Sequence, residues 1–185
     1  MNHNYFLQKT IELANESINN GGGPFAAIVV DQNGKIIGIG QNSVTKKSDP
    51  TAHAEVEAIR QACQNLNSFQ LDNCILYTSC EPCPMCLGAI YWARPAEVYY
   101  AATKIDAAAV GFDDAFIYEQ IQKPHYLRNI PFLSLPLETK NTPFVYRITQ
   151  SSNTISICSL SRPNTEAFFM QILVSLSIPI GNVLF

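Results

Sequence analysis

Two short clusters of metal-ligating side chains stand out in the sequence: Thr51-Ala-His53-Ala-Glu55 and Cys80-Glu-Pro-Cys83-Pro-Met-Cys86. Each cluster falls where a helix is predicted to begin. A Cys-x-x-Cys pair at a helix start places two sulfurs on one side of one turn, close enough to share a metal ion. The positive end of the helix dipole favours thiolates there, and the thiolate is the form that binds zinc. Cys83 and Cys86 are therefore candidate zinc ligands, and His53 would supply a third, imidazole ligand.

Three protein ligands are typical of a catalytic zinc site, because the fourth tetrahedral position is then open to water. Zinc in such a site lowers the pKa of bound water to about 7. Glu55 lies two positions after His53, and a carboxylate near that water without binding the metal could carry protons. The local pattern leaves other interpretations open, because Cys80, Cys83 and Cys86 could also form a structural knuckle or contain a redox pair.

The composition describes the setting in which this chemistry would occur. The chain has 185 residues, of which 47% are hydrophobic and 15% charged, with a formal net charge of -3. These values exclude an intrinsically disordered chain, and they argue against a sequence-independent nucleic-acid binder because there is no basic excess. The polar start Met1-Asn-His-Asn4 precedes an amphipathic segment, so no secretory signal is visible. We therefore expect a soluble cytoplasmic protein whose cysteines are metal ligands or free thiols.

Helices and strands alternate along the first three quarters of the chain. Apolar periodicity and turn signals predict helices over 3–19, 52–66, 84–92 and 113–121, and strands over 25–30, 35–40, 74–78, 96–101 and 132–137. Apolar strands separated by helices favour a central sheet that is covered on both faces. The predicted fold class is α/β.

The composition changes near residue 144. Residues 1–144 carry 24 charged side chains, whereas residues 145–185 carry only Arg147, Arg162 and Glu166. We therefore expect a domain over 1–144 that carries the chemistry and an atypical apolar tail over 145–185, whose role the sequence does not reveal. Polar residues, proline and glycine interrupt the apolar end of the tail, so no membrane span is expected.

The order His-x-Glu followed by Pro-Cys-x-x-Cys is typical of zinc-dependent nucleobase deaminases. On these residues, the segment from about Gly22 to Phe144 resembles the cytidine/deoxycytidylate deaminase-like superfamily. Within that superfamily, four longer stretches make this segment resemble the bacterial guanine deaminases. These stretches are Gly40-Gln-Asn42, Asp49-Pro-Thr-Ala-His-Ala-Glu55, the run from Tyr77 to Arg94, and Gly111-Phe-Asp-Asp114.

The resemblance implies a three-layer α/β/α fold with a central five-stranded mixed sheet, and one zinc ion per subunit of a homodimer. It implies that His53, Cys83 and Cys86 hold the zinc and that Glu55 is the main proton carrier. Three further roles follow from it: Asn42 would bind the purine ring, Phe25 would lie against the face of the ring, and Asp114 would act on the exocyclic amine.

The implied reaction is the hydrolytic deamination of guanine to xanthine and ammonia in purine metabolism, with a small purine base as the substrate. In such enzymes the end of the chain also helps to close the neighbouring subunit's site, a pattern that residues from Val145 onward do not follow.

Two other functions stay open at this point. A tRNA-specific adenosine deaminase would share the zinc chemistry, but it would be expected to carry basic side chains around its pocket, and this chain is acidic. A non-catalytic zinc-binding module would share the fold, but a structural zinc site has no need for a proton carrier such as Glu55. Without the resemblance, Asn42 would be interpreted as a turn residue, Asp114 as a helix-start acid and Phe25 as part of the core.

Overall fold

A computed structural model describes residues 1–151 of the chain. Its elements in chain order are α1 (His3–Asn19), β1 (Ala26–Val30), β2 (Ile36–Gln41), α2 (Val44–Lys47), α3 (Ala54–Leu66), β3 (Ile75–Cys80), α4 (Pro84–Ala93), β4 (Glu97–Ala102), α5 (Lys104–Ala109), α6 (Ala115–Gln122), the short 3₁₀ helix η1 (His125–Leu127) and α7 (Thr142–Ser151). The chain divides into two compact units, one of residues 1–133 and one that begins at residue 134. The sheet and all the candidate site residues belong to the first unit.

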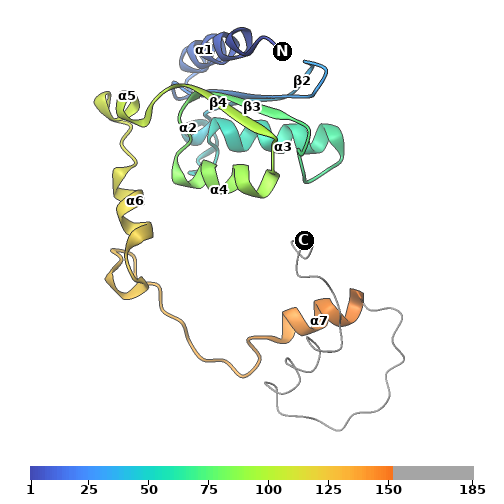
Figure 1. The fold of residues 1–185 in the computed structure, drawn as a ribbon. Helices are drawn as coiled ribbons and strands as arrows, with labels where there is room; N and C mark the ends of the chain where they lie inside the picture. Colours follow the sequence, from blue (N-terminus) through green and yellow to red (C-terminus); the bar gives the residue numbers. More distant parts are fainter. Residues whose placement is uncertain (152–185) are drawn as a thin grey trace. The chain divides into compact units, whose positions relative to one another are not determined.

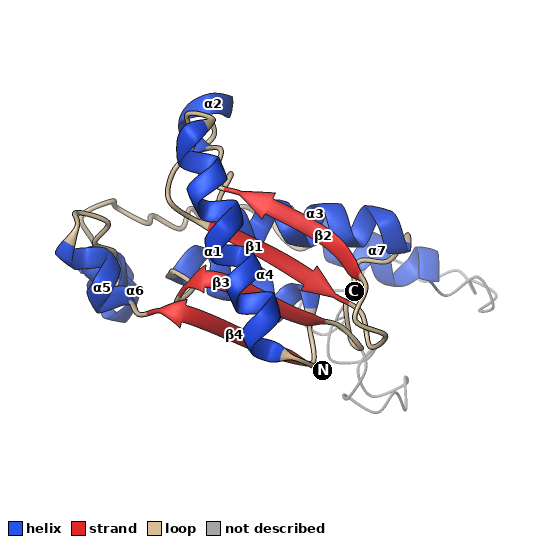
Figure 2. Cartoon of the chain, turned by 90° about the horizontal axis from the view of Figure 1, so that it is seen from above, coloured by secondary structure: helices blue, strands red, loops and turns tan. Residues whose placement is uncertain are grey.

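The sheet has four strands in the order β2-β1-β3-β4 (Figure 2). β1 pairs antiparallel with both β2 and β3, whereas β3 and β4 run parallel. The hairpin between β1 and β2 turns at Asn33-Gly34, where Gly34 has a φ of 82°, a left-handed conformation that glycine adopts without strain. The predicted α/β class and mixed sheet are confirmed, with four strands rather than five in the described part of the chain.

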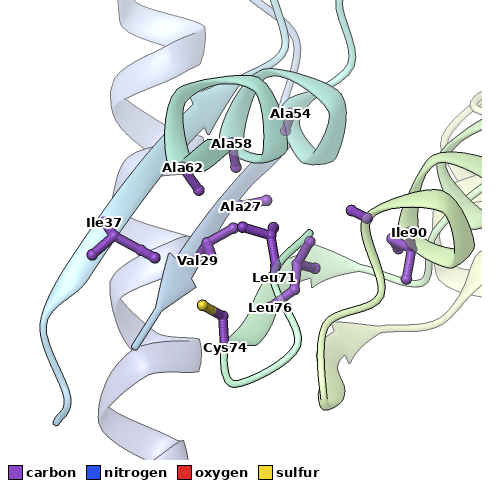
Figure 3. Packing of buried hydrophobic residues seen from close by; sticks show 11 residues of the cluster. Ala27, Val29, Ile37, Ala54, Ala58, Ala62, Leu71, Cys74, Leu76 and Ile90 are labelled. Carbon is purple, nitrogen blue, oxygen red and sulfur yellow. The ribbon is translucent and has the colours of Figure 1, made fainter. Parts of the chain in front are cut away.

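Helices cover both faces of this sheet, with α1 on one face and α3 and α4 on the other (Figure 1). All five residues of β1 are buried, as expected for a central strand with packed layers above and below. Its alternate residues contact different layers: Ala26, Ile28 and Val30 cluster with α1, while Ala27 and Val29 cluster with α3 (Figure 3). The three-layer arrangement therefore follows from the two-residue period of a strand that is apolar throughout.

Two glycines let α3 lie very close to the edge strand β2. A Cβ atom at Gly38 would lie 2.3 Å from the carbonyl oxygen of Ala58, and one at Gly40 would lie 1.9 Å from the carbonyl oxygen of Ala54. No side chain fits at either position unless the backbone of α3 moves. Because Ala54 is flanked by His53 and Glu55, Gly40 sets the distance between the sheet and the start of the helix that carries these two residues.

The strand predicted over 132–137 is wrong. Residues 131–137 have no regular structure, and they pair with no strand of the described chain. The alternation of apolar residues resembles a strand, but Pro131 and Pro136 have no N–H group to donate to a neighbouring strand. Short helices at 44–47, 104–109 and 142–151 were not predicted from the sequence.

The structure gives no test of the predicted domain boundary near residue 144. Helix α7 crosses it, and most of the predicted tail, residues 152–185, lies outside the described residues. Among the described residues, no helix is both long and apolar enough to span a membrane.

Candidate active site

The two predicted ligand clusters lie at the starts of two neighbouring helices. His53 is the N-cap of α3 and has extended backbone angles (φ -74°, ψ 155°). Cys83 is the N-cap of α4 (φ -66°, ψ 168°) and is followed by Pro84 at the first helical position, where proline fits well. Cys86 lies within the first turn of α4 and is fully buried. Both helices therefore direct their positive dipole ends at this point, which favours thiolates.

The side chains of His53, Cys83 and Cys86 form one compact donor group. The Nδ1 atom of His53 lies 3.6 Å from the Sγ atom of Cys83 and 3.5 Å from that of Cys86. In a tetrahedral zinc site, with Zn–S of about 2.3 Å and Zn–N of about 2.0–2.1 Å, an imidazole nitrogen and a sulfur lie about 3.5–3.6 Å apart. The donor types and their separations therefore fit zinc before any movement of the protein. Of the described residues, these three make up the one group suited to hold a metal ion.

Cys80 is not part of this group. Its Sγ atom lies 3.6 Å from the backbone oxygen of Thr103, to which the thiol donates a hydrogen bond. The pattern of three cysteines left open a structural knuckle of Cys80, Cys83 and Cys86. The structure instead pairs the last two cysteines with His53, the three-ligand pattern of catalytic zinc sites.

Glu55 lies directly against the donor group. One carboxylate oxygen is 3.3 Å from the Sγ atom of Cys86, and the other accepts a hydrogen bond of 3.3 Å from the hydroxyl of Thr78 in β3. The residue is only 6% exposed, and burial raises the pKa of its carboxyl group above the ordinary value. A carboxyl group with a raised pKa beside a metal site holds a proton more readily than an ordinary carboxyl group, which suits it to take up and pass on protons.

The two cysteines differ in how readily they lose a proton. The hydrogen bond from Cys86, with a further one from His53, lowers the pKa of Cys83 to about 4. The same pairing raises the pKa of Cys86, and burial raises it further. The hydrogen bond with Cys83 raises the pKa of His53. Zinc binds the deprotonated forms of cysteine and histidine, so binding of the ion would release the protons that these groups hold.

A cavity of about 780 Å³ opens from this group, and it brings together the remaining predicted site residues. Asn42, directly after β2, and Phe25, directly before β1, line it together with Glu55. Asp114 lines it from the start of α6. Its side chain makes no capping hydrogen bond, whereas the carboxylate of Asp113 accepts one from the N–H of Ala115. Six of the seven predicted residues therefore line one cavity, and the seventh, Cys86, is buried beside it with its Sγ atom close to His53 and Glu55.

Several other residues of the cavity were not predicted. Phe112 lies edge-on to Phe25, with ring centroids 5.0 Å apart. Lys104 lines the wall, and its ammonium group lies 4.6 Å from the centre of the Tyr118 ring. Phe112 belongs to the Gly-Phe-Asp-Asp stretch on which the resemblance to the guanine deaminases rests, and this was the one sequence signal for it. No local pattern pointed to Lys104, whose position depends on how the chain returns after β4.

The fold and the three-ligand centre define a class of protein, and the comparison with protein families agrees with it. The cytidine and deoxycytidylate deaminase zinc-binding region matches residues 1–102. The chain belongs to this zinc-binding deaminase family, and zinc is the metal of the family's centre.

Within the family, the chain is similar to guanine deaminase of Bacillus subtilis, with 60% identity over 145 residues, 78% of this chain and 92% of that protein. The crystal structure of a B. subtilis guanine deaminase superposes with a TM-score of 0.77 and 55% identity, covering 86% of this chain and 99% of that one. The guanine deaminase of Nitrosomonas europaea is 36% identical, with a TM-score of 0.57 over 59% of this chain and 63% of that one. A tRNA-specific adenosine deaminase of Aquifex aeolicus is 41% identical over 102 residues, 55% of this chain and 67% of that protein.

Proposed function

We propose that this chain catalyses the hydrolytic deamination of guanine to xanthine and ammonia. The observation that carries the proposal is the placement of His53, Cys83 and Cys86 around one point, with the buried carboxyl group of Glu55 against them at one end of a cavity. The substrate is inferred from the guanine deaminases to which the chain is similar over most of its length.

In the proposed mechanism, His53, Cys83 and Cys86 hold one zinc ion per subunit. When bound, the zinc lowers the pKa of a coordinated water to about 7 and so supplies a nucleophile at neutral pH. Glu55 accepts a proton from the attacking water and gives it to a ring nitrogen next to the carbon that bears the amino group. Its burial and raised pKa support this role, because the carboxyl group can be protonated and deprotonated in one cycle.

The remaining residues hold the base and release ammonia. Asn42 would donate and accept hydrogen bonds at the edge of the purine ring, and Phe25 would pack against the face of the ring. Asp114 would pass a proton to the exocyclic nitrogen, because the amine must be protonated before it leaves. Burial raises the pKa of Asp114, and the charge of Cys83 raises it further, which supports a role as a proton donor.

The charges around the cavity favour a free base over a nucleic acid. The described residues that line it include four acids, Glu55, Glu81, Asp113 and Asp114, and a single lysine, Lys104. A tRNA substrate would bring phosphate groups close to the site, and the negative charge of Glu81 and Asp113 would repel them. This distribution supports guanine deamination over the adenosine deamination of the A. aeolicus relative.

We also propose that the protein acts in cytoplasmic purine metabolism as a homodimer. Large apolar side chains of the first unit are exposed to solvent, among them Ile105, Val110, Phe116 and Leu127. A second copy of the chain could cover such a surface. Sedimentation or light scattering of the purified chain would test the proposed homodimer, and a monomer at micromolar concentration would refute it.

An ammonia-release assay tests the function. The purified chain is incubated with guanine, adenine, cytosine or an RNA stem-loop that carries adenosine in its anticodon. We expect ammonia from guanine, with xanthine as the other product. Ammonia from the stem-loop but not from guanine would assign the chain to tRNA editing, and ammonia from none of the four would favour a non-catalytic zinc module.

A further inference from the structure

The backbone around Asn42 is fixed by the glycine-rich segment that connects α1 to β1. The N–H group of Gly23 donates to the carbonyl oxygen of Asn42 (3.3 Å), and the N–H group of Asn42 donates to that of Phe25 (3.0 Å). These two bonds continue the pairing of β1 with β2 beyond the ends of both strands. Asn42 therefore has a defined backbone position although it lies outside regular secondary structure.

The side chain of Asn42 packs directly on Gly23. A Cβ atom at Gly23 would lie 3.0 Å from both Cγ and Oδ1 of Asn42 and 3.3 Å from its Cβ. These are the three atoms nearest to such a Cβ, and all belong to the Asn42 side chain. On another side, the N–H group of Val44 donates to Oδ1 over 3.4 Å. The carboxamide is thus held between the backbone of Gly23 and that of Val44. Its amide nitrogen is the end that can donate a hydrogen bond to an acceptor on a ligand.

We propose that Gly23 is a positioning residue for substrate binding, because its lack of a side chain sets the place of the Asn42 carboxamide in the cavity. This inference rests on the proposed function, in which Asn42 binds the purine ring. A methyl group at position 23 would displace the carboxamide by several tenths of an ångström and weaken its hydrogen bond to the base. Its three nearest atoms all belong to Asn42 and none to the zinc ligands or Glu55, so its first effect is on the carboxamide.

Gly22 has a different role, which provides a contrast. A Cβ atom at Gly22 would lie 2.5 Å from the backbone oxygen of Asn42 and 2.5 Å from Oγ of Ser17 in α1. A substitution there would strain the junction between the helix and the sheet and would lower the stability of the fold. Of the two glycines, only Gly23 would act mainly through the Asn42 side chain.

A double-mutant cycle tests the proposal on the full chain with zinc bound. Gly23→Ala, Asn42→Ala and the double variant are compared with the wild type for the kcat and KM of guanine deamination and for Tm. Gly88→Ala is the matched glycine-to-alanine control, because a Cβ there has no atom within 4 Å. We expect Gly23→Ala to raise KM about tenfold, the scale of one weakened hydrogen bond, with little change in kcat.

The cycle separates a positioning role from a structural one. If Gly23 acts through Asn42, its substitution will not raise KM further once Asn42 is alanine. Any loss of Tm in Gly23→Ala will also shrink in the double variant, which keeps the test valid if the single variant folds poorly. Equal KM changes in both backgrounds, or no change in either, would overturn the inference while leaving guanine deamination intact. A wild-type chain that does not deaminate guanine would instead refute the proposed function, and this inference with it.

Discussion

Replacing Gly40 with alanine should displace the candidate active site without changing any of its residues. The new Cβ would lie 1.9 Å from the carbonyl oxygen of Ala54 and 2.5 Å from the backbone nitrogen of Ala58. Ordinary contact begins at 3.4 Å, so α3 and β2 must separate by about 1.5 Å at this point. Both atoms belong to helix backbone and cannot move aside as a flexible side chain could.

The expected cost has two parts. Overpacking of this kind destabilises proteins by about 1–3 kcal/mol, which for a chain of this size lowers Tm by roughly 2–12 °C. The displacement also moves His53 and Glu55 on α3 relative to the two cysteines on α4. Since a misplacement of about 1 Å can reduce a rate by about 100-fold, we expect guanine turnover to fall by one to two orders of magnitude.

Two further glycines serve as controls for this variant. In Gly38→Ala the new Cβ would also clash with α3, because it would lie 2.3 Å from the backbone oxygen of Ala58. This clash lies one helical turn further from His53 and Glu55. It should therefore lower Tm to a similar degree while reducing turnover less. Gly88→Ala in α4 meets no atom within 4 Å and should raise stability by up to about 1 kcal/mol, because alanine favours helix more than glycine does. A Gly40→Ala variant with the Tm and turnover of the wild type would refute the close packing on which this reasoning depends.

Two other substitutions test the metal group and the surface charges. Cys83→Ala should abolish both zinc binding and turnover, whereas Cys80→Ala should retain zinc, because the Cys80 thiol donates to a backbone oxygen instead. Metal analysis of the two purified variants by mass spectrometry tests this prediction. Loss of zinc from the Cys80 variant would contradict the three-ligand assignment. Partial burial opposes ionisation of Glu57, but its ion pairs with Lys47 and Arg60 outweigh that effect and lower its pKa below the ordinary 4.5. The stabilisation by this carboxylate is therefore complete above pH 4.5 and is lost as the pH falls through the lower pKa of the folded state. Since Lys47 and Arg60 are half exposed, Glu57→Gln should lower the free energy of unfolding by at most about 1 kcal/mol at pH 7. Urea unfolding of the wild type and the variant at pH 7 and pH 4 should show that this difference shrinks in acid. An equal difference at both pH values would contradict the ion pairing of Glu57.

The sequence predicted most of the fold where the apolar pattern was long. Helix α1 was predicted with the observed bounds, 3–19, because its apolar residues recur at helical spacing and Gly21 follows with a left-handed φ of 77°. The six-residue α5 was missed, although Thr103 and Asp106 form a capping box that marks its start. The strand predicted over 132–137 was wrong because Pro131 precedes this segment and Pro136 lies within it, and neither has an N–H group to donate to a neighbouring strand.

The candidate site was predictable to the extent that its chemistry is local in sequence. Cysteine and histidine at helix starts indicate a metal and made His53, Cys83 and Cys86 candidates, whereas the choice of these three over Cys80 came from the resemblance to zinc-dependent deaminases. The hydrogen bond from Thr78 to Glu55 could not be predicted, because it joins a strand and a helix 23 residues apart. The contact of Phe112 with Phe25 could not be predicted either, because it joins two loops 87 residues apart in the sequence.

The central claim is that a zinc centre with three protein ligands works together with the carboxyl group of Glu55. Its most direct test is to measure zinc content and guanine turnover side by side in the wild type and in Glu55→Gln, which keeps the shape of the side chain but removes its ability to carry protons. We predict one zinc ion per chain in both proteins and a fall in turnover of at least about 100-fold in the variant, the usual scale for the loss of a general acid and base. A Glu55→Gln protein that binds zinc and deaminates guanine at the wild-type rate would contradict the account.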